Sequence, residues 1–364
     1  MTAPEVPWQI EPHTLAKHAL YREYLGKWIP IMVQGAWKGD MTYAEGFAGP
    51  GVYKDGSPGS PVIALRALLD RQQLRGRFPA ARFLFVDLDP RCTQLLEQKL
   101  QAAANAVPLD QLAQHNIHVA VRTGPCEPNL VELLTEQGAW GRPMLVVLDT
   151  WGGAVPADLV KRVAANPSSE VVITIQPQYF SRFAGAEQVV HGDRVFGHTA
   201  WREVAGLPAD QKARWVLQRY RETLTDAGFT HVLDFELIDS RGQALYLVFG
   251  TSHDQGLRKM KEAMWDVDDV AGVGYRDPRD PDQQTLAIEL EPQTAPLRRL
   301  LRDYLTAQPD RAATVMDLRA FAFYRTVYKE SQVPPLVRQM LEEGELMLSD
   351  GGSFGWTRRV GLPG

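Results

Sequence analysis

Apolar runs of strand length alternate with segments of helical periodicity over most of the chain. Strand-like runs occupy residues 41–47, 82–88, 117–123, 143–149 and 170–176. The segments between them space apolar residues at helical intervals, as in PVIALRALLD (61–70). Strands that are almost continuously apolar and are joined through helices are typical of a parallel sheet covered on both faces. A leading helix is also predicted over residues 13–28, with Thr14 as its N-cap.

The pattern changes after a helix predicted over residues 211–228. Two further strands, 231–239 and 244–252, are separated by only a few residues. That link is too short for a parallel crossover, so the two strands must form a hairpin and one strand runs antiparallel. We therefore expect an α/β fold with the Rossmann-like sheet of class I S-adenosylmethionine (SAM)-dependent methyltransferases, seven strands with the last one antiparallel. Dinucleotide dehydrogenases keep their sixth strand parallel.

The remaining segments complete the predicted domain organisation. Residues 1–35 form a leading helical segment that caps the pocket, and residues 36–270 form the α/β domain, in which 177–210 is a lid or substrate-binding excursion. An acidic, turn-rich linker follows at 271–291. Three helical patterns and a hairpin around Asp350 then predict a C-terminal winged helix-turn-helix module over 292–364.

Composition excludes several classes of protein. With 364 residues, 45% hydrophobic and 23% charged, the chain has the make-up of a globular protein. Its apolar runs are far shorter than the roughly 20 residues of a membrane helix, and its N-terminus lacks the pattern of a secretory signal. Only Cys92 and Cys126 are present, which excludes a disulfide framework. We expect a cytoplasmic protein that does not bind a membrane.

Charge gives little support for bulk attraction to nucleic acid. The net charge is -5, and residues 292–364 carry 10 Lys+Arg against 8 Asp+Glu, a surplus of 2. A domain built mainly to grip phosphates normally shows a stronger basic stripe. The helix predicted over 334–345 offers Arg338 but also three glutamates. Contact with a nucleic-acid backbone and docking of a protein or second copy both stay open for this module; its other candidate cations are Arg325, Lys329, Arg358 and Arg359.

The first strand ends in YAEGFAGPG, a glycine-rich turn before a helix. Glycines there let the backbone turn tightly and approach a ligand closely. The spacing differs from the dinucleotide pattern G-x-G-x-x-G, and the acid on the second strand lies 36 residues beyond Gly51 instead of about 20, which disfavours NAD. A sharp turn without a ligand is the alternative. The candidate cofactor-binding residues are Glu45, Gly46, Phe47, Ala48, Gly49, Gly51, Asp87 and Gly124.

Two acidic residues follow the second strand in FVDLDP. Asp87 stands at the strand's carboxyl end, where a carboxylate can accept both ribose hydroxyls of an adenosine. Asp89 is followed by Pro90, which makes it a good N-cap for the next helix. We assign Asp87 to the ribose and Asp89 to the cap.

The fourth strand ends in Asp149, Thr150 and Trp151, at the crevice where doubly wound sheets bind substrates. In amino-methylating enzymes this position carries Asp or Asn, two prolines and an aromatic residue. The acid accepts a hydrogen bond from the target amine, and the ring stacks on the base. Asp149 and Trp151 are therefore the catalytic candidates, although Thr150 and Gly152 replace the prolines and Trp151 could equally pack in the core.

Other motifs carry weaker expectations. Pro125 and Cys126 resemble the nucleophile of cytosine C5 methyltransferases, but they follow the third strand instead of the fourth, which disfavours covalent catalysis. In the 177–210 excursion, Tyr179 and Arg182 are candidate substrate-binding residues. The histidines of this excursion lack a third ligand at suitable spacing, so no metal is expected.

Three runs resemble the three-Cys-motif partner family of bacteria and phages: YAEGFAGPGVYKDGSPGSP (43–61), FGHTAW (196–201) and LYLVFGTSHDQGLRKMKEAMW (245–265). The resemblance covers almost the whole chain. It implies a methyltransferase-like domain with SAM as cofactor, encoded beside a three-cysteine protein that resembles radical SAM enzymes. It also implies that Lys17 and His18 border the pocket as substrate-binding residues. Two departures are Thr150, where relatives tend to have proline, and Pro125 at the position of an adenine-side acid.

Two functions of different classes follow from these observations. The first is a SAM-dependent methyltransferase that acts on a nucleic acid or a modified base by in-line displacement. The alternative is a catalytically silent partner subunit that keeps the fold and docks the three-cysteine protein. A nicotinamide oxidoreductase is a third interpretation, supported only by the related fold.

Overall fold

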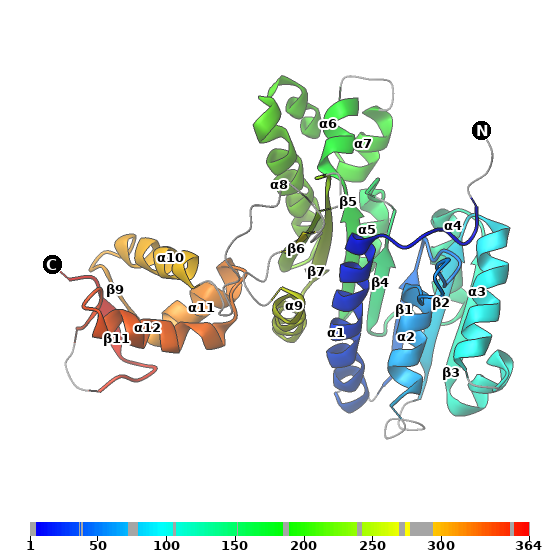
Figure 1. The fold of residues 1–364 in the computed structure, drawn as a ribbon, viewed down its shortest axis with the longest axis horizontal. Coiled ribbons are helices and arrows are strands. Elements are labelled where there is room, and N and C mark those ends of the chain that lie inside the picture. Colours follow the sequence, from blue (N-terminus) through cyan, green and yellow to red (C-terminus); the bar gives the residue numbers. More distant parts are fainter. Residues whose placement is uncertain are drawn as a thin grey trace. The chain divides into compact units, whose positions relative to one another are not determined.

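The computed structural model describes residues 5–35, 37, 39–71, 79–104, 107–150, 152–184, 189–238, 242–268, 274–276, 294–349 and 353–363. The chain divides into two compact units (Figure 1). The first comprises Met1–Lys259 with Gly274–Gln283, and the second comprises Met260–Val273 with Gln284–Gly364. No helix formed by the described residues is long and apolar enough to cross a membrane.

The first unit is built on one eight-stranded sheet in the order β3-β2-β1-β4-β5-β7-β6-β8. The strands β1 to β5 are parallel, whereas β7 pairs antiparallel with both β5 and β6. The predicted hairpin and the reversed strand are therefore confirmed, and this order fits a Rossmann-like methyltransferase sheet. The strand bounds are β1 Met41–Glu45, β2 Ala81–Asp87, β3 Ile117–Thr123, β4 Met144–Leu148, β5 Ser169–Ile175, β6 His231–Ile238, β7 Ala244–Thr251 and β8 Gly274–Arg276.

The strand β8 corrects the predicted linker. Its three residues pair parallel with β6, with Gly274 opposite Glu236, and so extend the sheet beyond the seven expected strands. A strand of three residues within an acidic, turn-rich stretch has too few apolar positions to be predicted from periodicity.

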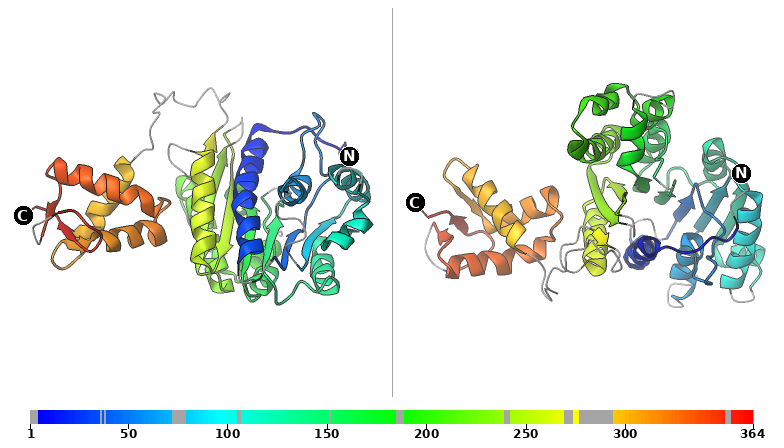
Figure 2. Two further views of the ribbon diagram at one scale, coloured as in Figure 1. Left: turned by 90° about the horizontal axis from the view of Figure 1, so that it is seen from below. Right: turned by 45° about the horizontal axis from the view of Figure 1, so that its top comes forward.

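Helices cover both faces of the sheet (Figures 1 and 2). Successive residues of a strand point to opposite faces, so Ala44 joins one core with helices α4, α5 and α8, while Tyr43 packs against Phe83 and Phe85 on the other face. The helices α1, α2 and α3 pack in sequence on that second face. Their bounds are α1 Pro12–Gln34, α2 Ser60–Leu69, α3 Pro90–Ala103, α4 Cys126–Glu136, α5 Ala157–Ala164, α8 Ala209–Ala227 and α9 Asp254–Val267, with a 3-10 turn at Leu109–His115.

The leading helix starts earlier than the sequence indicated. Its N-cap is Glu11, and Pro12 occupies the first helical turn, so the expected cap Thr14 is wrong. Proline suits this position because its missing N–H has no partner at the start of a helix. Thr14 is buried within the helix instead.

The 177–210 excursion is helical and partly a core element. It folds into α6 Pro177–Phe183, α7 Val189–Phe196 and a 3-10 turn, Ala200–Gly206, before α8 begins. Phe180, Phe196 and Trp201 are fully buried, and the rings of Phe196 and Trp201 stack with centroids 5.4 Å apart. These three aromatic side chains therefore pack in the core and do not form a substrate wall.

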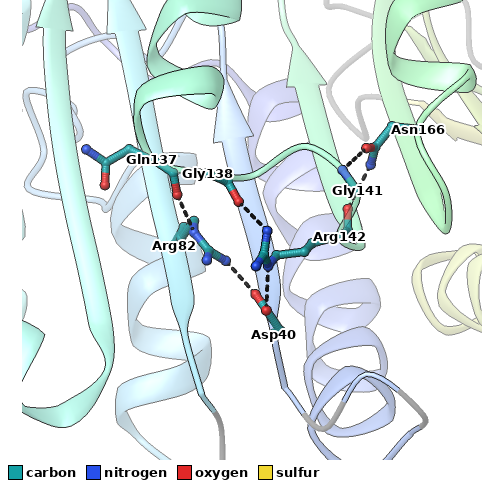
Figure 3. Close-up of polar contacts among 7 residues, drawn as sticks. All are labelled: Asp40, Arg82, Gln137, Gly138, Gly141, Arg142 and Asn166. Atoms are coloured by element: carbon teal, nitrogen blue, oxygen red, sulfur yellow. Dashed lines mark hydrogen bonds and ion pairs between the residues drawn. The ribbon is translucent and has the colours of Figure 1, made fainter.

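A polar cluster ties together the amino ends of the parallel strands (Figure 3). Asp40, just before β1, accepts hydrogen bonds from Arg82 Nη1 and Arg142 Nε, each at 2.6 Å. The Nδ2 of Asn166 donates a hydrogen bond to the carbonyl of Arg142 at 2.7 Å. These contacts join segments that precede or begin β1, β2, β4 and β5, so they fix the strands at the edge opposite their carboxyl ends.

The described part of the second unit comprises the end of α9, the helices α10, α11 and α12, and an antiparallel sheet in the order β10-β11-β9. Lys261, on the part of α9 that belongs to this unit, donates to the carbonyls of Ala322, Phe323 and Tyr328. Those contacts explain why the unit includes residues that the sequence assigned to the first domain. The bounds are α10 Ala295–Thr306, β9 Ala312–Thr314, α11 Val315–Arg325, α12 Val333–Glu342, β10 Met347–Leu348 and β11 Arg359–Gly361, with a 3-10 turn at Glu330–Gln332.

Candidate functional site

The glycine-rich turn after β1 is tightly packed. Gly51 adopts a left-handed backbone with φ of 70°, and a Cβ there would lie 2.7 Å from Leu96 Cδ1. A Cβ on Gly46 would lie 2.5 Å from the Sγ of Cys126. Glycine is therefore required at both positions, and the backbone of this turn lies at the carboxyl edge of the sheet.

Asp87 holds this turn in place. Its Oδ2 accepts the amide of Gly49 at 2.8 Å, and its Oδ1 accepts the amide of Asp89 at 2.9 Å. The side chain of Asp89 in turn accepts the amide of Arg91 and caps α3, which confirms the predicted N-cap. Asp87 thus links the glycine-rich turn to the end of β2, and its assignment to a ribose stays a prediction.

Glu45, at the end of β1, faces the protein interior. It is 1% exposed, and its oxygens accept hydrogen bonds from Tyr43 Oη at 2.7 Å and from Ser60 Oγ at 2.8 Å. Burial raises the pKa of Glu45 to about 8, although the hydrogen bonds from Tyr43 and Ser60 act in the opposite direction. The carboxyl group is therefore mostly protonated at neutral pH and anchors the first residue of α2.

Lys17 and Asp149 come together from distant parts of the chain. The Nζ of Lys17 on α1 donates to Oδ2 of Asp149, which follows β4. Burial acts to raise the pKa of Asp149, but the charge and hydrogen bond of Lys17 outweigh it, and the pKa lies below its usual range. Asp149 is therefore a charged carboxylate with one oxygen already engaged by Lys17.

His18 and Tyr21 add two polar groups beside this pair. Burial, followed by the charges of Lys17 and Arg22, lowers the pKa of His18 to about 3, so its ring stays neutral. The Nδ1 of His18 and the Oη of Tyr21 are both buried without a hydrogen-bond partner among the described residues. Because an unsatisfied buried polar group costs about 1–3 kcal/mol, these atoms point to a ligand at this edge of the sheet.

Tyr53, in the glycine-rich segment, contacts His18 with ring centroids 5.5 Å apart. The sequence did not indicate Tyr21 or Tyr53 as site residues. Lys17, His18 and Tyr21 occupy neighbouring positions on one helix face, so helical spacing from Lys17 could have found Tyr21. Tyr53 had no such pattern around it.

Gly124 and Cys126 lie beside the glycine-rich turn. Gly124 has φ of 153° and donates its amide to the carbonyl of Asp87 at 2.9 Å. Burial raises the pKa of Cys126 to about 12. The Cys126 side chain is therefore a thiol at neutral pH, which argues against the nucleophile role already disfavoured by its position.

The other predicted site residues are placed differently. Phe47 is exposed at the tip of the glycine-rich turn, and Ala48 is buried. Tyr179 packs against Phe180 and Phe183 on α6, while Arg182 is exposed. Trp151 lies outside the described residues.

The helix α7 contacts the segment that follows β4. A ring nitrogen of His191 lies 2.9 Å from the carbonyl of Gly153, which follows the end of β4. In the described residues, no group of three or more His, Cys, Asp or Glu side chains is arranged to hold a metal ion.

Comparison with known proteins adds little to this geometry. No protein-family model matches the chain, and no curated protein matches its sequence. Similar solved structures include an O-methyltransferase from Bacillus cereus in complex with SAH, 11% identical, which covers 67% of this chain and 83% of its own at a TM-score of 0.33. Another is the O-methyltransferase TomG from Streptomyces achromogenes in complex with SAM, 14% identical, with coverages of 68% and 93% and a TM-score of 0.31.

A putative O-methyltransferase from Klebsiella pneumoniae is 13% identical, covers 68% of this chain and 92% of its own, and gives a TM-score of 0.30. TM-scores this low carry no argument about the fold. The assignment of the fold therefore rests on the strand order of the sheet and on the reversed β7.

Proposed function

We propose that this chain is a SAM-dependent methyltransferase. The observation that carries the proposal is the glycine-rich turn, which Asp87 holds at the carboxyl edge of a sheet with a reversed β7. Ligands of open α/β sheets bind outside the carboxyl ends of the strands. The Lys17–Asp149 pair lies at the end of β4, the strand next to β1.

The residues present fit this cofactor. The backbone of residues 46–51, the Asp87 carboxylate and Gly124 would hold SAM. His18 Nδ1 and Tyr21 Oη, which have no hydrogen-bond partner among the described residues, would supply polar partners at the same edge. Bound there, the cofactor supplies an activated methyl group. Glu45 remains an interior anchor of the turn, because its side chain is fully buried and hydrogen-bonded to Tyr43 and Ser60, whereas Asp87 is partly exposed.

The chain's own side chains would orient the methyl acceptor. Lys17 holds one oxygen of Asp149, which fixes the carboxylate to accept a hydrogen bond from the accepting group. His18 serves as a hydrogen-bond partner and not as a general base, because a pKa of about 3 is too low to retain a proton at neutral pH. Orientation of the reacting groups is then the main contribution of the protein.

For the substrate class, we propose a nucleic acid or a modified base. The order α10-β9-α11-α12-β10-β11 in the second unit supports a winged-helix module. Arg338 lies over the ring of Phe354 at 4.7 Å, which places an exposed cation next to an aromatic ring. Arg298 pairs with Glu343 and Glu345, which reduces the repulsion that these glutamates would exert on phosphates.

A silent partner subunit that docks a three-cysteine protein is the second candidate. The second unit exposes large apolar side chains, with Met316 at 53%, Met347 at 51% and Trp356 at 57%. Met and Trp are enriched at protein–protein interfaces, so these side chains favour docking. Under this interpretation the chain keeps the fold but does not catalyse methyl transfer.

A methyl-transfer assay separates the two candidates. The full chain is incubated with SAM labelled in its methyl group and with DNA, RNA and protein fractions of the source organism. Transfer to nucleic acid by the wild type, abolished in Asp149→Asn, supports the enzyme. Co-purification with the three-cysteine protein at fixed stoichiometry, without transfer to any fraction, supports the partner subunit.

A further inference from the structure

A pocket within the first unit opens at the amino edge of the sheet, opposite the glycine-rich turn. It has a volume of about 230 Å³ and lies among the second half of α1, the start of β5 and the start of α9. This volume is below the roughly 300 Å³ at which drug-sized ligand sites begin, so the pocket suits a compact molecule. None of its lining residues belongs to the proposed active site.

A buried carboxyl group forms the floor of this pocket. Glu170 on β5 is 4% exposed, and its oxygens accept hydrogen bonds from Tyr24 Oη at 2.5 Å and Thr251 Oγ1 at 3.1 Å. A Cβ on Gly256, in the first turn of α9, would lie only 2.0 Å from Glu170 Oε1. The glycine thus lets the carboxyl group sit against the helix start, and each of its oxygens accepts one side-chain hydrogen bond in these contacts.

Aromatic rings form the walls. Tyr24 and Trp28 are buried beside Glu170, and Trp37 stands at the mouth, where its indole N–H donates to Ser168 Oγ at 3.2 Å. Ile31 and Met32 complete the apolar lining. A cation is attracted to the faces of such rings. Burial raises the pKa of Glu170 to about 7, and a cation bound beside this carboxyl group favours its ionised form, which then supplies a direct counter-charge.

Basic groups line the outer part of the pocket. Lys259 is half-buried in its wall and His253 is exposed at its mouth. The carboxyl group of Glu170 at the floor and the amino group of Lys259 in the wall therefore give the two ends of the pocket different chemical character.

We propose that this pocket binds a compact organic cation, an amine or quaternary ammonium with a neutral or anionic tail, whose cationic head lies against Glu170, Tyr24 and Trp28. The site is separate from the proposed active site, and its occupancy does not depend on methyl transfer. Its floor is fixed by the sheet pairing of Glu170 opposite Thr251.

Choline and trimethylglycine are the probes, with 3,3-dimethylbutan-1-ol as the neutral molecule of the same shape as choline. Each is titrated into the full chain by calorimetry and by tryptophan fluorescence. We expect saturable binding of both quaternary ammonium compounds and at least tenfold weaker binding of the neutral alcohol. We also expect at least tenfold weaker choline binding by Glu170→Gln, which keeps the size of the side chain but replaces one accepting oxygen with an amide that donates.

Trp37→Leu provides a second variant at a partly exposed side chain, and its thermal unfolding midpoint shows whether the fold is kept. We expect this substitution to weaken choline binding severalfold while the thermal unfolding midpoint stays unchanged. Absence of saturation by either cation in the wild type would overturn the proposal. Equal binding of choline and its neutral analogue, or equal binding by Glu170→Gln and the wild type, would also overturn it.

Discussion

Lys17 on α1 and Asp149 after β4 form a buried ion pair, although 132 positions separate them in the sequence. Their side chains are 7% and 15% exposed, so neither charge is well solvated. Through this contact the leading helix is joined to the carboxyl edge of the sheet, at the strand beside the glycine-rich turn. The pair is therefore both a structural link and part of the proposed site.

Removal of one partner should destabilise the protein strongly. Asp149→Ala leaves the Lys17 ammonium buried without its counter-charge, and we expect the free energy of unfolding to fall by about 3–5 kcal/mol in urea titrations. The double variant Lys17→Met with Asp149→Leu should recover most of this loss, because no charge remains buried. Lys161→Ala, which breaks an exposed pair with Asp158, serves as the control and should cost less than about 1 kcal/mol.

The double variant also separates structure from function. If the pair orients the methyl acceptor, the refolded double variant has no methyl-transfer activity despite near-normal stability. Full activity in that variant would show that the pair serves only the fold.

The buried Glu45 should make stability depend on pH. Its pKa is raised from 4.5 to about 8, so the native state holds a proton that the unfolded state releases above pH 4.5. The contribution of Glu45 to the free energy of unfolding is fully present below pH 4.5 and is lost as pH rises toward 8. The loss is about 1.4 kcal/mol for each pH unit over which the folded and unfolded states differ by one proton. Glu45→Gln cannot ionise.

The measurement is the urea midpoint of the wild type and of Glu45→Gln between pH 5 and pH 8. The stability of the variant relative to the wild type should increase steadily with pH. Glu170, whose pKa burial raises to about 7, is present in both proteins and cancels in the difference. A difference that stays constant with pH would mean that Glu45 ionises normally in the folded protein.

Two glycines with similar backbones should respond differently to alanine. Gly51 and Gly56 have φ of 70° and 86°, so both substitutions strain the backbone. At Gly51 the added Cβ meets Leu96, whereas at Gly56 no other residue that the structure describes lies within 4 Å of it, chain neighbours aside. We expect Gly51→Ala to cost about 1–3 kcal/mol more than Gly56→Ala in thermal or urea unfolding. Equal costs would show that the turn yields to the extra methyl group.

Both cysteines should resist alkylation in the folded chain. Burial raises the pKa of Cys92 and of Cys126 to about 12, so little thiolate exists at pH 8. Iodoacetamide at pH 8 should therefore modify neither residue within minutes, as read by mass spectrometry, while both react in urea. We also expect Cys126→Ala to retain methyl transfer; rapid alkylation of Cys126 together with loss of activity in that variant would restore a covalent role.

Much of the sheet could be predicted from the sequence because its strands are short, apolar and separated by amphipathic helices. The hairpin of β6 and β7 followed from the length of its connection alone. The strand β8 could not be predicted, since three residues carry no periodicity. The burial of Phe180, Phe196 and Trp201 was also missed, because a polar and aromatic composition does not reveal which rings pack against α8.

The candidate site was predicted less completely. The ends of β1, β2 and β4 indicated Glu45, Asp87 and Asp149, since parallel strands place their carboxyl ends at one edge. Their different chemical states, a protonated Glu45 and a paired Asp149, depend on contacts with Tyr43 and Lys17 that no local pattern contains. Lys17 and His18 entered only through the family resemblance.

Calorimetric titration of SAM into the wild type, Asp87→Ala and Asp89→Ala tests the central claim most directly. Asp89→Ala is the matched control, because it removes a helix cap at a cost of about 1 kcal/mol but does not release the glycine-rich turn. We predict micromolar binding by the wild type and by Asp89→Ala, and none by Asp87→Ala. Absence of binding by the folded wild type, or equal binding by all three proteins, would contradict the account.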